Sequence, residues 1–499
     1  MSTIRKKGII TTIFIYAGFL LGALNTYLYA KYFQPDQTGL TRVLLDIAVL
    51  SSSFALLGTN TIVVKFFPYY KNFHKENKSE LVTISFIFSL VGFLIIFLSF
   101  NTFMKPLIIR KFIGKAPLLV EYFYLVFPLT LFLTLFQVLE AQTWTIQKGH
   151  VANFLKEVLF RGINTILNVL FIGGLLSFPL YADLFSFQYF VIFAALIIYL
   201  LYARQLKMSF QISKLTKRLW KKMVPYSLFI LGSNVISLMS TTMDGIIISS
   251  LMGLSFTSVF INTQYISNFI VVPYRAALSM AAGPISQAWK DRDILKLDRI
   301  YKKTSLNLLI ASSFIFAMIM LNWDDLLNWV KPDPIYHLGK PVMFYLGLYQ
   351  VIELGTGMNS AIIITSRRWK FELYSNIILL TLTLPLTYIL IKHMGMIGAA
   401  LATLISRTIF NVVRFIFLYK VYNLQPFTKK TLLAVVLPLA VYPLVAYTIH
   451  LRDPLMGLIV RSAAFTAVYA FLLLQLRVSE DAMQVFETIK KRVRQLAGR

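Results

Sequence analysis

The stretch PYSLFILGSNVISLMSTTMDGIIISSLMGLSFTSVFINTQYISNFIVVPYRAALSMAAGPISQAWK, residues 225–290, decides the fold because it contains two apolar segments joined by a short uncharged turn. Each segment is long enough to cross a bilayer as a helix, which takes about 20 residues. Asp244 and Arg275 lie inside these segments. An ionisable residue within a membrane span is costly, so each of the two is a candidate functional residue.

The composition extends this interpretation to the whole chain. Of its 499 residues, 57% are hydrophobic and only 14% are charged, whereas soluble proteins carry about 25% charged residues. Apolar runs of about 18 residues or more recur from end to end, and we count about fourteen. These runs are continuously apolar and do not alternate, which argues against a β-barrel. We therefore expect an all-α, polytopic membrane protein.

The formal net charge of +28 has an uneven distribution along the chain. If the first span starts inside, about 35 of the Lys and Arg residues fall on the cytoplasmic side, as the positive-inside rule requires. Both termini are then cytoplasmic. The cation excess reflects orientation and contact with lipid headgroups, so we expect membrane lipids as partners and no nucleic acid.

Cysteine is absent from the sequence, which rules out disulfides, thiol catalysis and cysteine-ligated metals. The five histidines are scattered over predicted loops and span ends, so no zinc site is expected. We expect no cofactor and no enzymatic activity. No cleavable signal peptide is evident, because the first apolar run is too long and has no clear cleavage site.

The second half of the chain repeats the first at an offset of about 216 to 220 residues. Pro68, expected to stop the second span, corresponds to Pro284 at the end of the eighth. Six spans per repeat is an even number, so both repeats insert the same way up. The expected organisation is an N-terminal six-helix lobe (1–204), a basic cytoplasmic linker (205–223), a C-terminal six-helix lobe (224–420), helices 13 and 14 (421–478) and a cytoplasmic amphipathic tail (479–499).

Charged pairs can be predicted from helical spacing. Arg42 and Asp46 lie one turn apart on one face of the second span, where an ordinary interfacial pair is the alternative to a functional role. Glu157 and Arg161 have the i,i+4 spacing of a local ion pair. The segment Arg204–Met223 mixes apolar residues with cations, which suits a helix lying on an anionic inner leaflet.

Arg275 and Asp244 each allow two interpretations. Arg275 follows Pro273 and could bind a phosphate, since guanidinium offers a fixed fork of donors, or it could snorkel to the headgroups. Asp244 could serve ion coupling or gating, or it could be a hydrogen-bonded structural acid. Glu353 and Arg407, near the middle of two further spans, are expected to form a pair that either stabilises the second lobe or relays an ion.

Four stretches together resemble a known family: Gly58–Lys71, the span that carries Asp244, Ala281–Asp293 and Gly395–Ser406. The resemblance is to the Wzx-like polysaccharide-biosynthesis flippases. Their superfamily, the multidrug/oligosaccharidyl-lipid/polysaccharide (MOP) superfamily, also contains the MATE exporters and the lipid II flippase MurJ. The resemblance extends over nearly the whole chain in the number and spacing of spans.

This resemblance implies two six-helix lobes around a central cavity, with two further helices added. It implies a flippase that moves an undecaprenyl-pyrophosphate-linked oligosaccharide across the bacterial cytoplasmic (inner) membrane by alternating access, for synthesis of a surface polysaccharide such as lipopolysaccharide. A polysaccharide polymerase or glycosyltransferases are possible partners. The residues it implicates are Arg42 and Arg275 for substrate binding, and Asp46 and Asp244 as acidic partners or as part of a coupling-ion site for H+ or Na+. Glu353 and Arg407 are assigned to coupling or gating from their place within spans and not from the resemblance.

Other functional classes remain open alternatives. One is a MATE-type, cation-coupled exporter of small molecules. Another is a membrane glycosyltransferase or polymerase, but such an enzyme usually presents its carboxylates or metal on a sizeable extracytoplasmic loop, and every predicted loop here is short. A scaffold without transport activity is the last.

Overall fold

The computed structural model describes residues 3–73, 80–206, 209–484 and 487–488. These residues form helices joined by short turns, and none of them belongs to a strand, which confirms the predicted all-α class. Among these described residues, eleven helices are long and apolar enough to cross a membrane, and there are twelve if the bent pair Leu254–Arg275 and Met280–Asp291 is counted as one span. The chain is therefore a multi-pass membrane protein, and the expected count of about fourteen spans is not confirmed.

Two of the expected spans account for the difference in number. Residues 162–181 are not one helix, because α9 already ends at Ile172. The continuous helical run that contains it carries Lys156 and Glu157 just before it and Arg161 in its first turn, so this run is less apolar than a membrane span. The expected span 341–365 is interrupted at Gly357, which has a φ of +71° and ends the helix before it.

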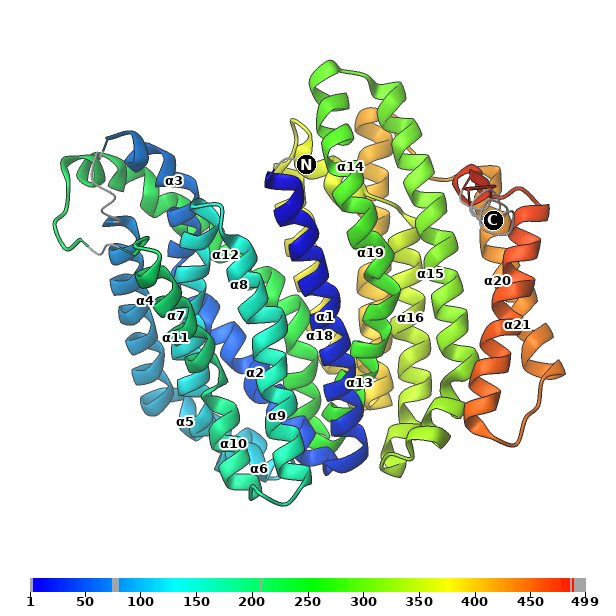
Figure 1. The fold of residues 1–499 in the computed structure, drawn as a ribbon, viewed down its shortest axis with the longest axis horizontal. Helices are drawn as coiled ribbons and strands as arrows, with labels where there is room; N and C mark the ends of the chain where they lie inside the picture. The colour runs from blue at the N-terminus through cyan, green and yellow to red at the C-terminus, as the bar shows by residue number, and fades with distance from the viewer. Residues whose placement is uncertain (1–2, 74–79, 207–208, 485–486, 489–499) are drawn as a thin grey trace, which may run out of the picture. The chain divides into compact units, whose positions relative to one another are not determined.

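The chain folds into two compact units, Met1–Ile261 and Asn262–Arg499, and each is described by itself. The first unit is drawn from blue to green in Figure 1. Its helices are α1 (Thr3–Tyr32), α2 (Pro35–Ala55), α3 (Thr59–Phe73), α4 (Glu80–Ser99), α5 (Lys105–Phe112), α6 (Pro117–Glu121), α7 (Val126–Thr145), α8 (Gly149–Phe154), α9 (Phe160–Ile172), α10 (Phe178–Ser186), α11 (Gln188–Tyr202), α12 (Lys214–Leu251) and the first part of α13 (Leu254–Ser267). Short π-helical turns, η1 (Phe100–Met104) and η3 (Leu155–Leu159), and the 3-10 turn η2 (Phe123–Leu125) connect some of them.

The second unit contains the remaining helices. They are α14 (Val272–Asp291), α15 (Ile294–Val330), α16 (Gly339–Gly355), α17 (Asn359–Thr365), α18 (Lys370–Met394), α19 (Met396–Tyr422), α20 (Lys429–Thr448) and α21 (Pro454–Gln475), with the 3-10 turns η4 (Asn268–Val271) and η5 (Pro334–Leu338). Helices α20 and α21 pack on α15 through a cluster that includes Leu309, Val441 and Phe465.

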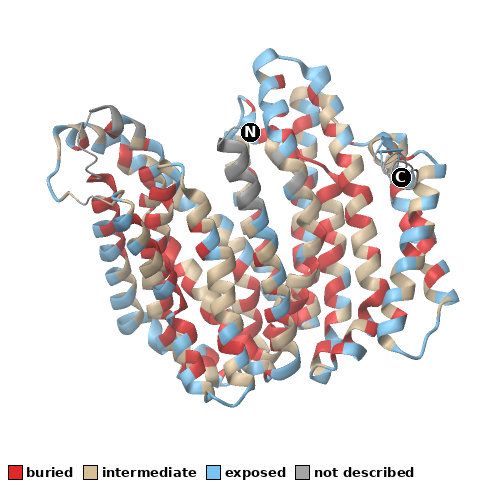
Figure 2. Ribbon diagram, viewed as in Figure 1, coloured by how far each residue is buried: buried red, intermediate tan, exposed pale blue. Residues whose placement is uncertain are grey.

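Burial follows the packing within each unit, as Figure 2 shows. In the first unit the buried side chains gather around α2 and α7, with Leu44 and Leu129 fully enclosed. Helix α4 instead exposes a row of large apolar residues, among them Val91, Leu94 and Leu98. Apolar side chains on an outward face indicate contact with lipid tails, because lipid, unlike water, accepts them without cost.

The expectation that Pro68 stops a helix is wrong, because α3 continues through residue 68 to Phe73. Packing holds this segment in place: Phe66 and Tyr70 are buried in a cluster with Met223, and the Tyr70 hydroxyl lies 2.5 Å from Thr216 Oγ1. Pro284 likewise lies inside a helix, α14, and not at its end. Transmembrane helices tolerate such prolines because neighbouring groups satisfy the freed backbone.

The second part of the predicted basic linker (205–223) belongs to a longer helix. Helix α12 runs without a break from Lys214 to Leu251, with Pro225 inside it. Its N-cap Ser213 accepts a hydrogen bond from the Thr216 amide, and the Ser213 amide donates to Glu80 Oε1 over 2.6 Å. The basic segment is therefore fixed to α4 instead of lying as a separate helix. The predicted domain limits stay a prediction, and most of the predicted tail helix lies outside the described residues.

Candidate functional site

The first candidate site lies where α2 packs against α12 in the first unit. Asp46 is half-buried on α2, and Asp244 on α12 is 5% exposed. A Cβ on Gly245 would lie only 3.0 Å from Asp46 Oδ2, so the Asp46 carboxylate rests directly on the backbone beside Asp244. The structure thus brings together two of the predicted carboxylates from helices that are 200 residues apart in sequence.

Arg42 lies one turn before Asp46 on the same helix, as its spacing predicts. The two side chains form no ion pair within 4.0 Å among the described residues, although Arg42 contributes to the electrostatic field at Asp46. The Arg42 Nε is buried and makes no hydrogen bond in the part of the chain that the structure describes. A buried guanidinium donor without an acceptor is costly, and an anionic ligand could satisfy it.

Two buried tyrosines lie close enough to Arg42 for its positive charge to interact with their hydroxyl groups. Their hydroxyls, on Tyr29 of α1 and Tyr181 of α10, are 2.8 Å apart. Each also donates or shares a hydrogen bond of 2.8 Å with an asparagine of α9, Tyr29 with Asn164 and Tyr181 with Asn168. This network ties three helices together next to the charged residues.

Glycines permit close approach at three levels between one segment, α2 and the turn after it, and another, α12 and the start of α13. A Cβ on Gly39 would collide with the carbonyl oxygen of Leu254, and one on Gly58 with that of Ser227. Gly58 also has a φ of +71°, a conformation that residues with a Cβ rarely adopt. With Gly245 between them, these glycines let α2 and the turn after it lie close to α12 and the start of α13.

Hydrogen bonds close both ends of this α2–α12 seam. At one end Ser255 Oγ donates to Asp36 Oδ1 over 2.6 Å. At the other, the Ser227 hydroxyl donates to the carbonyl oxygen of Leu57. The carboxylates and Arg42 lie between these two ends along α2.

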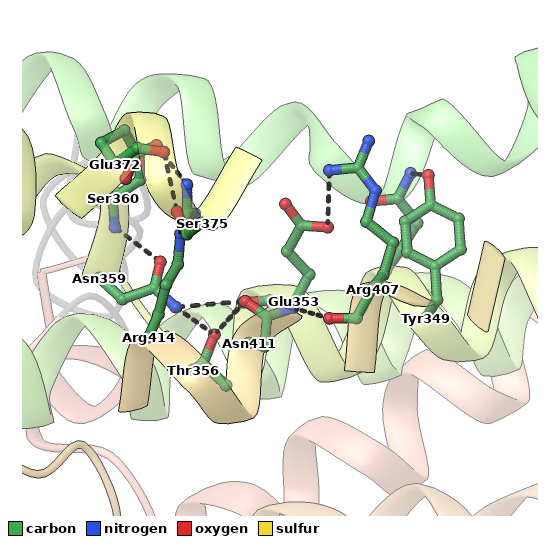
Figure 3. A network of polar contacts seen from close by, with 11 residues as sticks. Tyr349, Glu353, Thr356, Asn359, Ser360, Glu372, Ser375, Arg407, Asn411 and Arg414 are labelled. Carbon is green, nitrogen blue, oxygen red and sulfur yellow. Dashed lines mark hydrogen bonds and ion pairs between the residues drawn. The ribbon is translucent and has the colours of Figure 1, made fainter. Parts of the chain in front are cut away.

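The second candidate site is a polar network among α16, α17, α18 and α19 in the second unit (Figure 3). The predicted pair is present: Arg407 Nη1 lies 3.9 Å from Glu353 Oε2. Both side chains are partly accessible, with 21% of Arg407 and 32% of Glu353 exposed. The contact is loose, so its groups can change partners at low cost.

A tighter ion pair, which the sequence did not reveal, lies beside it. Arg414 on α19 bonds to Glu372 on α18, with side-chain exposures of 6% and 16%, and stacks on the Phe410 ring 3.8 Å away. Ser360 Oγ donates to the same Glu372 oxygen over 2.9 Å. Glu372 Oε2 is buried and receives no hydrogen bond from any described residue.

Amides and hydroxyls join the two pairs. Asn411 Nδ2 donates to the carbonyl oxygen of Arg407 over 3.0 Å, and Asn411 Oδ1 accepts from Asn359 Nδ2 and Thr356 Oγ1. The Asn359 amide also donates to Thr356 Oγ1 over 3.1 Å. Thr356 and Asn359 lie at the broken connection between α16 and α17, where Gly357 interrupts the helix.

Arg275 has a different setting from the other predicted site residues. It is exposed, in the first turn of α14, directly after the 3-10 turn η4 and next to Pro273. The helical axis bends by 50° between Arg275 and Met280.

The local pair Glu157–Arg161 is confirmed at 2.9 Å. Among the described residues no three His, Asp or Glu side chains come together in a way that could hold a metal ion. Glu372 was missed because it follows the polar run Ser366–Lys370 and looked like part of a turn. The signal that could have led to Glu372 was Arg414, a charged residue inside a predicted span with no acidic residue at helical spacing.

Comparisons with known proteins agree with this architecture. Residues 229–389 match the MatE family model, which is about a third of the chain. No curated protein sequence matches it.

Solved structures with the same fold are transporters. The lipid II flippase MurJ in an inward closed conformation superposes with a TM-score of 0.71 at 18% identity, over 94% of this chain and 99% of that one. An inward-facing multidrug-resistance MATE transporter of the MOP superfamily gives 0.64 at 17% identity, over 81% of this chain and 94% of that one. A MOP superfamily transporter from Pyrococcus furiosus gives 0.56 at 16% identity, over 84% and 96%. The chain therefore has the fold of the MOP superfamily transporters.

Proposed function

We propose that the protein is a flippase that carries a lipid-linked oligosaccharide, anchored through a pyrophosphate, from one leaflet of the bacterial cytoplasmic membrane to the other. The observation that carries this proposal is the extent of the MurJ likeness, which covers 94% of the chain against 81–84% for the MATE structures.

Arg42 supports a substrate with a phosphate group. A pyrophosphate cannot enter hydrocarbon without compensating donors, and guanidinium binds phosphate in a bidentate way. The buried and unsatisfied Nε of Arg42 is such a donor within a membrane helix. In the proposal Arg42 and Arg275 bind the pyrophosphate at different stages of transport.

The carboxylates would supply the energy coupling. Asp46 and Asp244 are close together in a poorly solvated place, where two negative charges repel, so binding of H+ or Na+ would favour the packed α2–α12 seam. The loose Glu353–Arg407 pair would serve the second unit in the same way. Release of the ion would loosen the packing and favour the alternate conformation.

A reconstituted assay tests the substrate. Purified protein is placed in proteoliposomes that contain a fluorescent undecaprenyl-pyrophosphate-linked oligosaccharide, and the fraction accessible to an external quencher is followed over time. We expect faster transbilayer movement than in empty vesicles, and loss of at least about tenfold in rate for Arg42→Ala because a charge-assisted contact is removed. Arg42→Lys should retain part of the activity.

Arg275→Ala has a matched control in Arg292→Ala, which removes another exposed arginine at the C-terminal end of the same helix. We expect Arg275→Ala to slow flipping and Arg292→Ala to leave it unchanged. Equal rates for both variants would remove Arg275 from the substrate path. No flipping by the unaltered protein would contradict the proposed substrate.

A MATE-type exporter of small molecules is the alternative function, and the match of residues 229–389 to the MatE family model favours it. The same vesicles, loaded with a fluorescent cationic dye, distinguish the two. Dye export driven by a proton or sodium gradient, together with no movement of the lipid, would select the exporter.

A further inference from the structure

Helix α4, the π-helical turn η1 and α5 form one uninterrupted run from Glu80 to Phe112. Its 33 residues extend about 50 Å at about 1.5 Å per residue. The hydrocarbon core of a bilayer is about 30 Å thick, so part of the run must leave it. Helix α5 forms this end, on the side of the first unit away from the N-terminus (Figure 1).

Exposed side chains along the end of this run change from mainly apolar to mainly cationic, with Lys105 among the first group and Ile113 among the second. Phe103, Met104 and Leu107 are exposed, and Leu107 is 61% accessible. Arg110 and Lys111, also exposed, follow one turn further along the same outward side. This order matches the change from lipid tails to headgroups at the surface of a bilayer.

The positive charge at this end has no acidic counterpart nearby in sequence. Residues 105–116 contain Lys105, Arg110, Lys111 and Lys115 and no Asp or Glu. None of Lys105, Arg110 and Lys115 forms an ion pair with a carboxylate of the described residues. Such a cluster on the side opposite the basic N-terminus runs against the positive-inside rule, so orientation does not explain it.

The segment that carries these cations is packed against the core of the first unit. Phe112, Ala116 and Leu119 are buried in the core of the first unit. The Phe112 carbonyl accepts hydrogen bonds from the Lys115 and Ala116 amides, and the Lys115 carbonyl oxygen lies against Gly253 of the turn after α12. The charged side chains are therefore held at a fixed place relative to the exposed apolar ones.

We propose that residues 103–115 form a docking surface for the phosphate headgroups of anionic phospholipids, in the leaflet opposite the N-terminus. Exposed Phe103, Met104 and Leu107 enter the boundary between headgroups and tails, and the cations beside and beyond them contact the phosphates. Apolar burial combined with cations is how interfacial segments select anionic lipid. This lipid site is separate from Arg42 and the carboxylates and goes beyond the proposed transport function.

A lipid-retention experiment tests the surface without any transport. The full-length protein is reconstituted in nanodiscs of phosphatidylcholine with increasing amounts of phosphatidylglycerol, and the lipids that remain bound after detergent extraction are counted by native mass spectrometry. The test variant is Lys105→Gln/Arg110→Gln/Lys115→Gln. The control, Lys156→Gln/Lys303→Gln/Lys340→Gln, removes the same net charge from cations that are paired with carboxylates.

We expect the test variant to bind phosphatidylglycerol at least about tenfold more weakly than the unaltered protein, because each cation near an anionic surface contributes about a fivefold factor. The control should bind as the unaltered protein does, and the loss should shrink at high salt. Unchanged binding by the test variant would overturn the proposal, as would an equal loss in both variants. Displacement of the lipid by soluble pyrophosphate would also overturn it, since the surface would then be a site for free phosphate.

Discussion

The two ion pairs of the second unit differ in burial, which predicts very different contributions to stability. Arg414 and Glu372 are 6% and 16% exposed, whereas Arg407 and Glu353 are 21% and 32% exposed and 3.9 Å apart. Removing one member of a buried pair leaves the other charge without compensation, at a cost of about 3 kcal/mol or more. An accessible pair contributes about 1 kcal/mol or less.

The perturbation is therefore Arg414→Met, with Arg407→Met as its control on the same helix. After Arg414→Met, Glu372 keeps only the hydrogen bond from Ser360, and its second oxygen already lacks one. We expect a loss of about 3 kcal/mol for Arg414→Met and of about 1 kcal/mol or less for Arg407→Met. The double variant Arg414→Met/Glu372→Gln should recover much of the loss, because no charge then stays buried.

The assay is reversible unfolding of the purified protein in mixed detergent and denaturant micelles, followed by tryptophan fluorescence. The four proteins of the cycle are the unaltered chain, the two single variants of the buried pair and the double variant. Their coupling free energy isolates the pair. Additive losses, or a loss for Arg407→Met as large as that for Arg414→Met, would refute the reasoning that burial decides the strength of these pairs.

Three further predictions concern the first unit. Gly58→Ala should destabilise it by about 1 kcal/mol or more, because the residue has a positive φ and its Cβ site is occupied, while Gly114→Ala, which meets no atom within 4 Å, should be neutral in the same unfolding assay. Tyr181→Phe removes two hydrogen bonds of a buried hydroxyl and should cost about 1–3 kcal/mol; an unchanged melting temperature would show that the α1–α9–α10 network does not stabilise the fold. Asp46→Asn and Asp244→Asn should each slow flipping in proteoliposomes, and the double variant should be no slower than the slower single one if the two carboxylates act together.

Two kinds of feature could be predicted from the sequence: those that depend on residue spacing within one helix, and those that depend on the lipid around it. Continuous apolar runs identify membrane helices whatever their neighbours are, and the i,i+4 spacing of Glu157 and Arg161 determines their contact within one helix. The Glu353–Arg407 contact was predictable for another reason. A charge inside a span needs a partner, and few candidates existed.

The features that were missed depend on contacts between distant segments. Gly58 and Gly357 interrupt the helical path with a positive φ, and Ser227 and Ser305 from distant segments occupy the place of a Cβ at each, which no apolar window reveals. The helix around Pro68 continues because Tyr70 packs on residues of α12. Asp46 meets Gly245 across a seam whose register is set by glycines on both helices, so sequence spacing alone could not place the two carboxylates together.

The unbroken run of α12 has a practical consequence for dissecting the protein into fragments. By the sequence repeat the natural place to divide the chain is near residue 204, before α12. However, α12 covers α2 from Ser227 to Gly245 and begins on Glu80, so a fragment that ends before Lys214 would leave α2 without this covering helix. Two halves produced separately should reassemble best when the first one ends in the turn at Met252, with α12 complete.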